Sequence, residues 1–310
     1  VPDYVRCVSY TSFRAIYELG TAKAWVDNNL KPEYLIKRKN QRYMQTWHGD
    51  RGPKAVLCDS NTADPNRRYV ETKGCDVMLT GSSFGERKLR GAFRYEGEFL
   101  KCGCPRNDML INPDPCRVNA VRSALGLDET CRLVLYAPTF REYCKYQSRP
   151  QDIGDIDLTS LLDQLENHTG EKWRCLLRRH HSVRALKNQK VDGRVIDVSD
   201  YDEMNELMLI SDILITDYSS SSGDFPLTKR TLILYHPDFG DYSKERSLYF
   251  DFKDTPFIIA RSQQELEKIA CETSAEEAAE NCRKILRFFN VYETGAATER
   301  AAECILQWFS

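Results

Sequence analysis

The 310-residue sequence contains no apolar run that approaches the ~20 residues needed to span a bilayer. Its first residues lack a basic segment followed by an apolar one, so no secretory signal is expected and we predict a cytoplasmic protein. The formal net charge is only −2, which gives no reason to expect nucleic acid as a partner. Hydrophobic residues make up 41% of the chain, enough for one large domain or two medium ones.

Motifs for common cofactors and metals are also lacking. The sequence has no Walker pattern, no G-x-G-x-x-G, no H-E-x-x-H and no C-x-x-C pair. Its twelve cysteines are irregularly spaced, and Cys102-x-Cys104 has no second pair or nearby histidine that would suggest zinc. We therefore expect free thiols in a reducing compartment, and we predict neither a metal nor a cofactor.

Short apolar runs alternate with helical patterns, which predicts an α/β protein with parallel sheets. The expected strands cover 76–79, 132–136, 174–177, 195–198, 212–215 and 232–235. Capping-box spacing at Asp200 and Glu203, and again at Ser274 and Glu277, predicts two helix starts. The two prolines within residues 112–115 indicate a linker. We predict domains over 1–112 and 113–290, followed by a C-terminal segment, 291–310, whose last helix packs back on the first domain.

The most informative segment runs from Ile213 to Asp224. An apolar strand is followed by Thr216, Asp217 and four serines, then by a helix-like segment and a second strand. Such a turn presents unpaired N–H groups and hydroxyls at a helix N-terminus, where phosphate binds well. We predict a phosphate site formed by Ser219 and Ser220, with Thr216 and Asp224 also contacting substrate. For Asp224, as for Asp217, either a bond to a ribose or a structural hydrogen bond is expected. An ordinary serine-rich loop, in which Asp217 holds the turn, is the alternative.

Histidines are scarce, with five in the chain. His48 lies in a glycine-containing turn where the backbone can approach a ligand closely, and Lys54 nearby would favour an anion. A surface-loop histidine is the alternative interpretation. His180 and His181 follow two arginines at the end of one expected strand, and Arg141 follows another. If these strands belong to one sheet, the three strand ends converge on one anion-binding crevice.

These segments together resemble the CDP-glycerol glycerophosphotransferase family of teichoic-acid primases and polymerases. The similar motifs occur in the family's order along most of the chain: Thr21–Ala24, Gln45-Thr-Trp-His-Gly49, Gly103-x-Pro-Arg-Asn-Asp108, Tyr136-Ala-Pro-Thr-Phe-Arg141, Leu177-Arg-x-His180 and Asp212–Ser220 with Asp224.

The resemblance implies a GT-B-like architecture, with two Rossmann-like domains facing a cleft. The N-terminal domain is expected to be short, with a further strand–helix unit before residue 1. By the same resemblance, His48 is the general base and His180 contacts the donor's diphosphate. Ser219, Ser220 and Arg141 assist there, with His181 as the second choice. The sequence departs from the family at Asp50–Lys54, where Thr-Pro-Leu-Lys is usual after Trp-His-Gly.

The resemblance also implies the reaction. A polyol phosphate, glycerol phosphate in the first place, moves from a CDP-activated donor to a polyol-phosphate or lipid-linked acceptor, and CMP is released. This chemistry serves teichoic acid or capsule synthesis, without a metal. A GT-B glycosyltransferase and a non-catalytic nucleotide-binding scaffold are the alternatives. Because family acceptors are lipid-linked, peripheral contact with the cytoplasmic face of the membrane is expected, and the basic cluster Lys37–Lys39 with Arg42 could touch anionic lipid.

Overall fold

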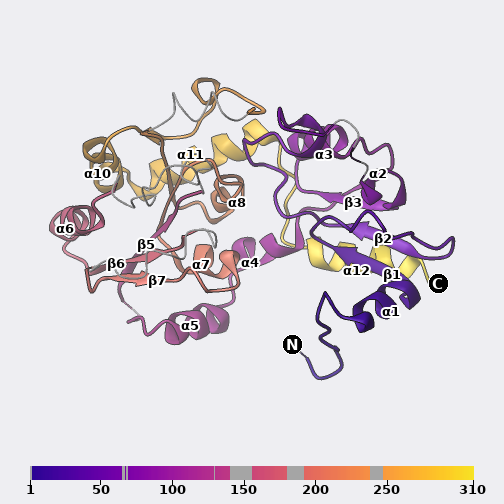
Figure 1. Cartoon of the computed structure of the whole chain (residues 1–310). Coiled ribbons are helices and arrows are strands. Elements are labelled where there is room, and N and C mark those ends of the chain that lie inside the picture. The colour runs from indigo at the N-terminus through magenta and orange to yellow at the C-terminus, as the bar shows by residue number, and fades with distance from the viewer. Residues whose placement is uncertain are drawn as a thin grey trace, which may run out of the picture.

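A computed structural model of the chain describes residues 2–64, 67, 69–128, 130–139, 156–179, 192–237 and 247–310. It contains two parallel β-sheets, each covered by helices and lying side by side (Figure 1). The first sheet has the order β1-β2-β3-β4 and the second has the order β10-β9-β8-β5-β6-β7. The mixed α/β class expected from the alternating pattern is confirmed.

The N-terminal sheet consists of β1 (Ala24–Asp27), β2 (Arg42–Gln45), β3 (Val77–Thr80) and β4 (Glu98–Lys101). Every residue of β3 is buried, as expected for an inner strand of a parallel sheet with both faces covered. Three helices belong to this half: α1 (Phe13–Thr21), α2 (Val70–Gly74) and α3 (Ser83–Phe93). Short helical turns follow β4 at Pro105–Asn107 and at α4 (Asp108–Ile111).

The C-terminal sheet consists of β5 (Arg132–Ala137), β6 (Trp173–Leu177), β7 (Val195–Asp197), β8 (Ile213–Thr216), β9 (Thr231–Tyr235) and β10 (Ile259–Ala260). The strands expected from the sequence are confirmed to within one or two residues. Alternate residues along these strands face two separate cores. The first core includes α5 (Pro115–Ala124), α7 (Met204–Ile210) and α11 (Ala275–Phe289), and the second includes α6 (Leu158–Thr169) and α10 (Gln263–Glu272).

The two capping predictions have different outcomes. At α11, the Ser274 hydroxyl accepts the Glu277 N–H at 3.2 Å while the Glu277 carboxylate accepts the Ser274 N–H at 2.9 Å, so the capping box is confirmed. The prediction for Asp200 and Glu203 is wrong, because α7 begins only at Met204 and Glu203 makes no side-chain cap. A turn closed by the Tyr201 N–H on the Val198 carbonyl at 3.0 Å delays the helix start.

The last helix, α12 (Ala297–Gln307), crosses back to the N-terminal half (Figure 1). Its buried residues Ala297 and Ala301 share a core with Met44, Val77 and Leu79 of the first sheet. The division at residues 112 and 113 stays a prediction. The described part of the chain includes no helix of the length and apolarity that crossing a membrane requires. The eleven cysteines that the structure describes are free thiols.

Backbone hydrogen bonds join the two halves at two places. Residues 53–55 run antiparallel to 247–249, where the Tyr249 N–H donates to the Pro53 carbonyl at 2.8 Å. Residues 81–83 pair with 290–292, where the Tyr292 N–H donates to the Gly81 carbonyl at 2.8 Å. These contacts fix how the loops at the facing edges of the two sheets meet.

Candidate active site between the two halves

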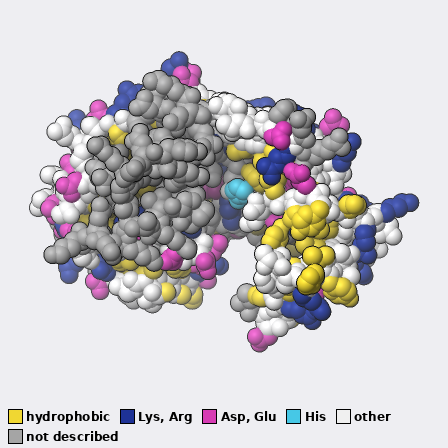
Figure 2. All heavy atoms as spheres, in the orientation of Figure 1, with side chains coloured by type: hydrophobic (Ala, Val, Ile, Leu, Met, Phe, Trp, Pro, Cys, Tyr) yellow, Lys and Arg dark blue, Asp and Glu magenta, His cyan; other side chains and the backbone are white. Residues whose placement is uncertain are grey.

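Two loops from different halves touch at the centre of the molecule. One follows β2 and carries His48, and the other follows β8 and carries the serine turn. A Cβ atom added to Gly49 would lie 2.6 Å from the Ser220 Oγ, and one added to Gly52 would lie 2.9 Å from the Ser220 Cβ. Both glycines are therefore required for this close approach. Figure 2 shows a histidine side chain at the surface between the halves, beside basic side chains.

His48 has a defined tautomer because of its partner. Its Nδ1 lies 2.7 Å from the carbonyl oxygen of Asn28, which can only accept, so Nδ1 carries the proton. One face of the ring packs on Trp47, with the two ring centroids 4.0 Å apart, while the residue keeps contact with solvent. Partial burial lowers the pKa of His48, the Asn28 bond opposes this, and the charges of Arg106 and Lys88 lower it further. At neutral pH the ring is therefore uncharged, with a free lone pair on Nε2.

The serine turn is held by its own hydroxyls and by buried neighbours. The Ser221 Oγ lies 3.0 Å from the Ser219 Oγ, and the Ser222 Oγ donates to the Ser219 carbonyl at 2.7 Å. The helix that follows, α8 (Ser221–Asp224), is only four residues long and continues as a 3₁₀ turn. Thr216 is fully buried and donates to the Ala137 carbonyl at 2.7 Å, so it faces the neighbouring strand β5.

Asp217 accepts backbone N–H groups from both strand ends, at 3.0 Å from Thr139 and 2.6 Å from Tyr218. These contacts match the structural role considered for it, that of holding the turn. The β5 and β8 strands are neighbours at the point where the sheet order reverses, which is where α/β sheets bind ligands. The serine turn therefore lies at a suitable edge for a ligand.

Asp224 lies beneath these loops in a buried network of charges. Its carboxylate, 6% exposed, accepts from the Arg51 guanidinium and from Arg106 at 3.0 and 3.2 Å. Asn107 also donates to it, at 3.1 Å, and Arg51 pairs with Glu293 at 3.0 Å. Burial opposes ionisation of Asp224, but the charges of Arg106 and Arg51 outweigh it and lower the pKa to about 2. These contacts support a role in joining the halves, whereas the predicted substrate contact of Asp224 stays a prediction.

Two cations beside the His48 loop, the buried Lys88 and the partly buried Arg106, were missed by the sequence reasoning. Lys88 of α3 is 5% exposed and donates to the Gly52 carbonyl at 3.0 Å, and burial lowers its pKa to about 8. Arg106 lies within a quoted motif but received no role, although its guanidinium also reaches the Trp47 carbonyl at 3.5 Å. Nothing in the sequence around Lys88 singled it out, because its position depends on how α3 packs.

Of the remaining predicted site residues, the structure describes one, Lys54. Lys54 forms the antiparallel bridge with Leu248 that joins the halves. Arg141, His180 and His181 lie outside the described residues. The strands that lead toward them, β5 and β6, are neighbours, and their C-terminal ends lie on the same sheet edge as the serine turn. Among the described residues, no group of three or more His, Cys, Asp or Glu side chains is arranged to hold a metal ion.

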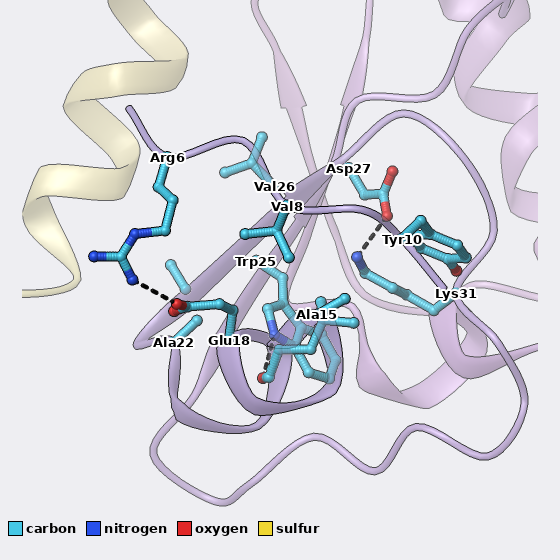
Figure 3. Close-up of a pocket in the computed structure, with 12 residues that line it drawn as sticks. Arg6, Val8, Tyr10, Ala15, Glu18, Ala22, Trp25, Val26, Asp27 and Lys31 are labelled. Carbon is cyan, nitrogen blue, oxygen red and sulfur yellow. Dashed lines mark hydrogen bonds and ion pairs between the residues drawn. The ribbon is translucent and has the colours of Figure 1, made fainter. Parts of the chain in front are cut away.

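A separate pocket of about 760 Å³ lies beside β1 and α1 in the N-terminal half (Figure 3). Apolar side chains such as Val8 and Trp25 line it, together with the ion pairs Arg6–Glu18 and Lys31–Asp27. None of the predicted site residues lines this pocket.

Comparisons with known proteins agree on one family. The sequence profile described as CDP-Glycerol:Poly(glycerophosphate) glycerophosphotransferase matches residues 1–307. A teichoic acid poly(glycerol phosphate) polymerase of Bacillus spizizenii is 30% identical over 95% of this chain and 77% of its own length. A teichoic acid glycerol-phosphate transferase of Staphylococcus aureus is 29% identical over 97% of this chain and 80% of its own. A polymerase of Staphylococcus epidermidis is 31% identical, but the chain spans only 40% of its length.

Solved structures give the same result. Wall teichoic acid polymerase TagF superposes with a TM-score of 0.86 at 28% identity, over 99% of this chain and 78% of that one. A TagF structure soaked with CDPG has a TM-score of 0.84, also at 28% identity, over 99% of this chain and 77% of that one. The GT-B-like α/β architecture expected from the sequence is confirmed.

Proposed function

The chain belongs to the CDP-Glycerol:Poly(glycerophosphate) glycerophosphotransferase family, and from that premise we propose that it transfers glycerol phosphate from CDP-glycerol in teichoic acid synthesis. The acceptor is a polyol phosphate or a lipid-linked primer, and CMP is the second product. Relatives at about 30% identity are named for this transfer, and some are named for ribitol phosphate instead. Glycerol phosphate is preferred because the more similar relatives carry it in their names.

The proposed step is a direct displacement at phosphorus. An acceptor hydroxyl attacks the phosphorus that bears the donor's glycerol, its O–H proton passes to the Nε2 of His48, and the bond to CMP breaks. A neutral imidazole with a free Nε2 can take that proton, and general-base assistance is typically worth ~10²–10⁴-fold in rate. The Ser219 and Ser220 hydroxyls and N–H groups are proposed to bind the donor's diphosphate, together with Arg141 and His180.

One observation carries this proposal: the loop with the free imidazole nitrogen touches the serine turn. Gly49, which follows His48 directly, lies against Ser220 so closely that a side chain would not fit. The loop of the proposed base from one half and the proposed phosphate-binding turn from the other therefore lie in contact. This is the arrangement that a transfer between a bound donor and an incoming hydroxyl requires.

We propose that protein cations, rather than a metal, neutralise the transferring phosphoryl group. Lys88 and Arg106 lie next to the His48 loop, and their charges act on its imidazole. Positive groups fixed in a water-poor site stabilise developing negative charge effectively. Turnover that survives EDTA treatment is the expected result, and turnover that returns only with added Mg²⁺ or Mn²⁺ would refute this part of the proposal.

The function is tested by offering the protein CDP-glycerol, CDP-ribitol and UDP-sugars with a polyol-phosphate acceptor. Release of CMP from CDP-glycerol is expected, and His48→Ala is expected to lose at least ~10²-fold in turnover while titration calorimetry shows CDP-glycerol still bound. Release of UDP would instead identify a glycosyltransferase. Nucleotide binding without any release would identify a scaffold.

We also propose that the outer surface of the N-terminal half contacts anionic lipid. Large side chains there are strongly exposed, with Phe13 92% and Ile36 86% exposed, and the exposed cations Arg38 and Lys39 follow. Figure 2 shows hydrophobic and basic side chains gathered at the lower right, where the first elements lie. Aromatic and aliphatic side chains flanked by cations are typical of membrane-surface contacts.

Sedimentation with vesicles tests this contact. The wild-type protein is expected to bind vesicles that contain phosphatidylserine and to bind neutral vesicles only weakly. The double variant Phe13→Ser, Ile36→Ser is expected to lose binding to the phosphatidylserine vesicles. Phe288→Ser is the matched control, because Phe288 is a partly exposed phenylalanine on α11 in the other half. Equal binding by both variants would refute the proposed surface.

A further inference from the structure

Gln45, the last residue of β2, has a fully buried side chain whose polar atoms are all engaged. Its amide nitrogen donates to the Asn29 carbonyl at 2.9 Å and to the Tyr43 hydroxyl at 2.9 Å. Its amide oxygen accepts the backbone N–H of Trp47 at 2.8 Å. Because a carbonyl can only accept and an N–H can only donate, the orientation of this amide is unambiguous.

The partners of Gln45 belong to the two segments that determine where the His48 ring lies. Asn28, next to Asn29, provides the carbonyl that accepts the His48 Nδ1–H at 2.7 Å. Trp47 provides the backbone that leads directly into His48. A single buried amide therefore joins the acceptor of the imidazole to the chain that carries the imidazole.

The backbone conformation of Trp47 explains why the hydrogen bond from its N–H to Gln45 is needed. Its φ is +52°, a left-handed conformation that a bulky side chain rarely adopts. The N–H bond to Gln45 helps to hold it, together with the Arg106 guanidinium, which reaches the Trp47 carbonyl at 3.5 Å. The buried indole also meets Phe93 edge-on, with the centroids 4.9 Å apart. Without the Gln45 oxygen, the Trp47 N–H would be a buried donor without this partner, and the turn before His48 would lose a fixed point.

Further buried hydrogen bonds fix the position of the Gln45 side chain. The Tyr43 hydroxyl that accepts from Gln45 donates in turn to the Glu71 carboxylate at 2.9 Å. Glu71 is fully buried and also accepts the Lys31 backbone N–H at 2.7 Å. A chain of buried hydrogen bonds therefore runs from Glu71 to the backbone beside His48, and buried networks of this kind restrict movement.

We propose that Gln45 is a positioning residue for the transfer reaction: it fixes the place and the tautomer of the His48 imidazole by joining the Asn28–Asn29 segment to Trp47. This inference rests on the proposed role of His48 as the general base. It assigns to Gln45 no contact with donor or acceptor. Loss of the Gln45 amide changes the orientation of the His48 imidazole and leaves the affinity for the donor unchanged.

The test compares Gln45→Met with Gln41→Met. Gln41 is a matched control in the same half: it is 2% exposed, its amide donates to the Leu19 and Ala22 carbonyls at 2.9 and 2.8 Å, and its oxygen accepts the Arg38 N–H at 3.3 Å. Both variants remove a buried amide that joins two backbone segments. Only Gln45 joins segments that contact His48.

Gln45→Met is expected to lower kcat by about 10- to 100-fold, because small misplacements of a catalytic group cost rates of this order. KM for CDP-glycerol is expected to change by less than about threefold, as for loss of an interaction made only in the transition state. The acid limb of the kcat profile is expected to move to lower pH, since the bond to Asn28 raises the pKa of His48. Gln41→Met is expected to keep both kcat and the position of that limb.

A second readout does not depend on activity. Nitrogen-15 NMR of the imidazole is expected to show the Nδ1–H tautomer at His48 in the wild type and in Gln41→Met, and a mixture of tautomers in Gln45→Met. Should Gln45→Met not fold, Gln45→Asn, which keeps the amide but is one methylene shorter, is measured with the same expectations.

The two possible failures can be told apart. A Gln45 variant whose kcat, pH profile and His48 tautomer match those of Gln41→Met would overturn the positioning role. The Nε2–H tautomer at His48 in the wild type would overturn it as well. Full activity of His48→Ala would instead refute the proposed base, and the NMR comparison would still decide whether Gln45 orients the ring.

Discussion

Replacing Asp224 by asparagine tests the buried charge network that joins the two halves. The substitution keeps the size of the side chain but removes its charge. It leaves one acceptor oxygen where two now accept from Arg51, Arg106 and Asn107. The new amide hydrogens would face guanidinium donors, so at least one buried donor loses its partner. The halves then lose contacts that run through Asp224, while the Arg51–Glu293 pair and the backbone contacts between them remain.

The expected loss can be bounded in two ways. A carboxyl pKa lowered from its ordinary value of 3.8 to about 2 corresponds to about 2–3 kcal/mol of favourable interaction with the folded state. Removing one partner of a buried ion pair typically costs ~3–5 kcal/mol, because the remaining charge is left buried. We therefore expect Asp224→Asn to lower the free energy of unfolding by about 3–5 kcal/mol.

Urea unfolding followed by tryptophan fluorescence measures this change. Glu171→Gln is the matched control, because it also removes a carboxylate from an arginine, Arg132, but in a pair whose two side chains are each 46% exposed. That variant is expected to lose no more than ~1 kcal/mol. If Asp224→Asn loses as little as the control, the network contributes nothing beyond a surface pair and the reasoning is wrong.

Three further predictions concern the same region. The pKa of His48 is lowered, and the proposed base must be unprotonated. CMP release is therefore expected to fall with acidification only below about pH 6.5, and a fall in rate that begins above pH 7 would contradict the assignment. Gly49→Ala places a Cβ 2.6 Å from the Ser220 Oγ and should lower turnover at least ~10-fold, whereas Gly20→Ala, with nothing within 4 Å, should keep it. Asp224, whose pKa is lowered in the folded state, stabilises the fold fully above about pH 4, and this contribution should disappear as the pH falls toward 2. The urea midpoint of unfolding should therefore fall less over that pH range in Asp224→Asn than in the wild-type protein.

The strands and the approximate place of the site were predictable because they depend on local patterns. Apolar runs bounded by polar turns predicted β5 to β9 of the C-terminal sheet, although not its short edge strand β10. The turn after Thr216 was recognised from its hydroxyls. The glycines around His48 indicated a close approach of backbone, although not that the approaching atom belongs to Ser220. That contact depends on the packing of one half against the other, which no local pattern encodes.

The buried charge network could not be predicted from the sequence, because its members lie far apart along the chain. Arg51 and Asp224 are 173 positions apart, and Asn107 and Glu293 are 186 apart. Each of these residues alone is an ordinary polar residue, and only the fold removes them from water together. The assignment of Asp224 to substrate binding followed from its place after the serines. A structural hydrogen bond was the alternative, but its partners, Arg51, Arg106 and Asn107, could not be identified without the tertiary contacts.

The segment from Gln45 to Gly52 performs several tasks at once, and this shapes how variants of it must be interpreted. It carries His48, which we propose as the base, the close contact at Gly49, and the buried cation Arg51 that pairs across to the other half. A buried ion pair adds little net stability compared with apolar packing, so its value lies in fixing one arrangement of the partners. Here that arrangement is the one that places the loop carrying His48 against the serine turn. Loss of activity on changing Arg51 therefore says nothing about chemistry unless stability is measured as well, whereas His48→Ala at unchanged stability isolates the proton transfer.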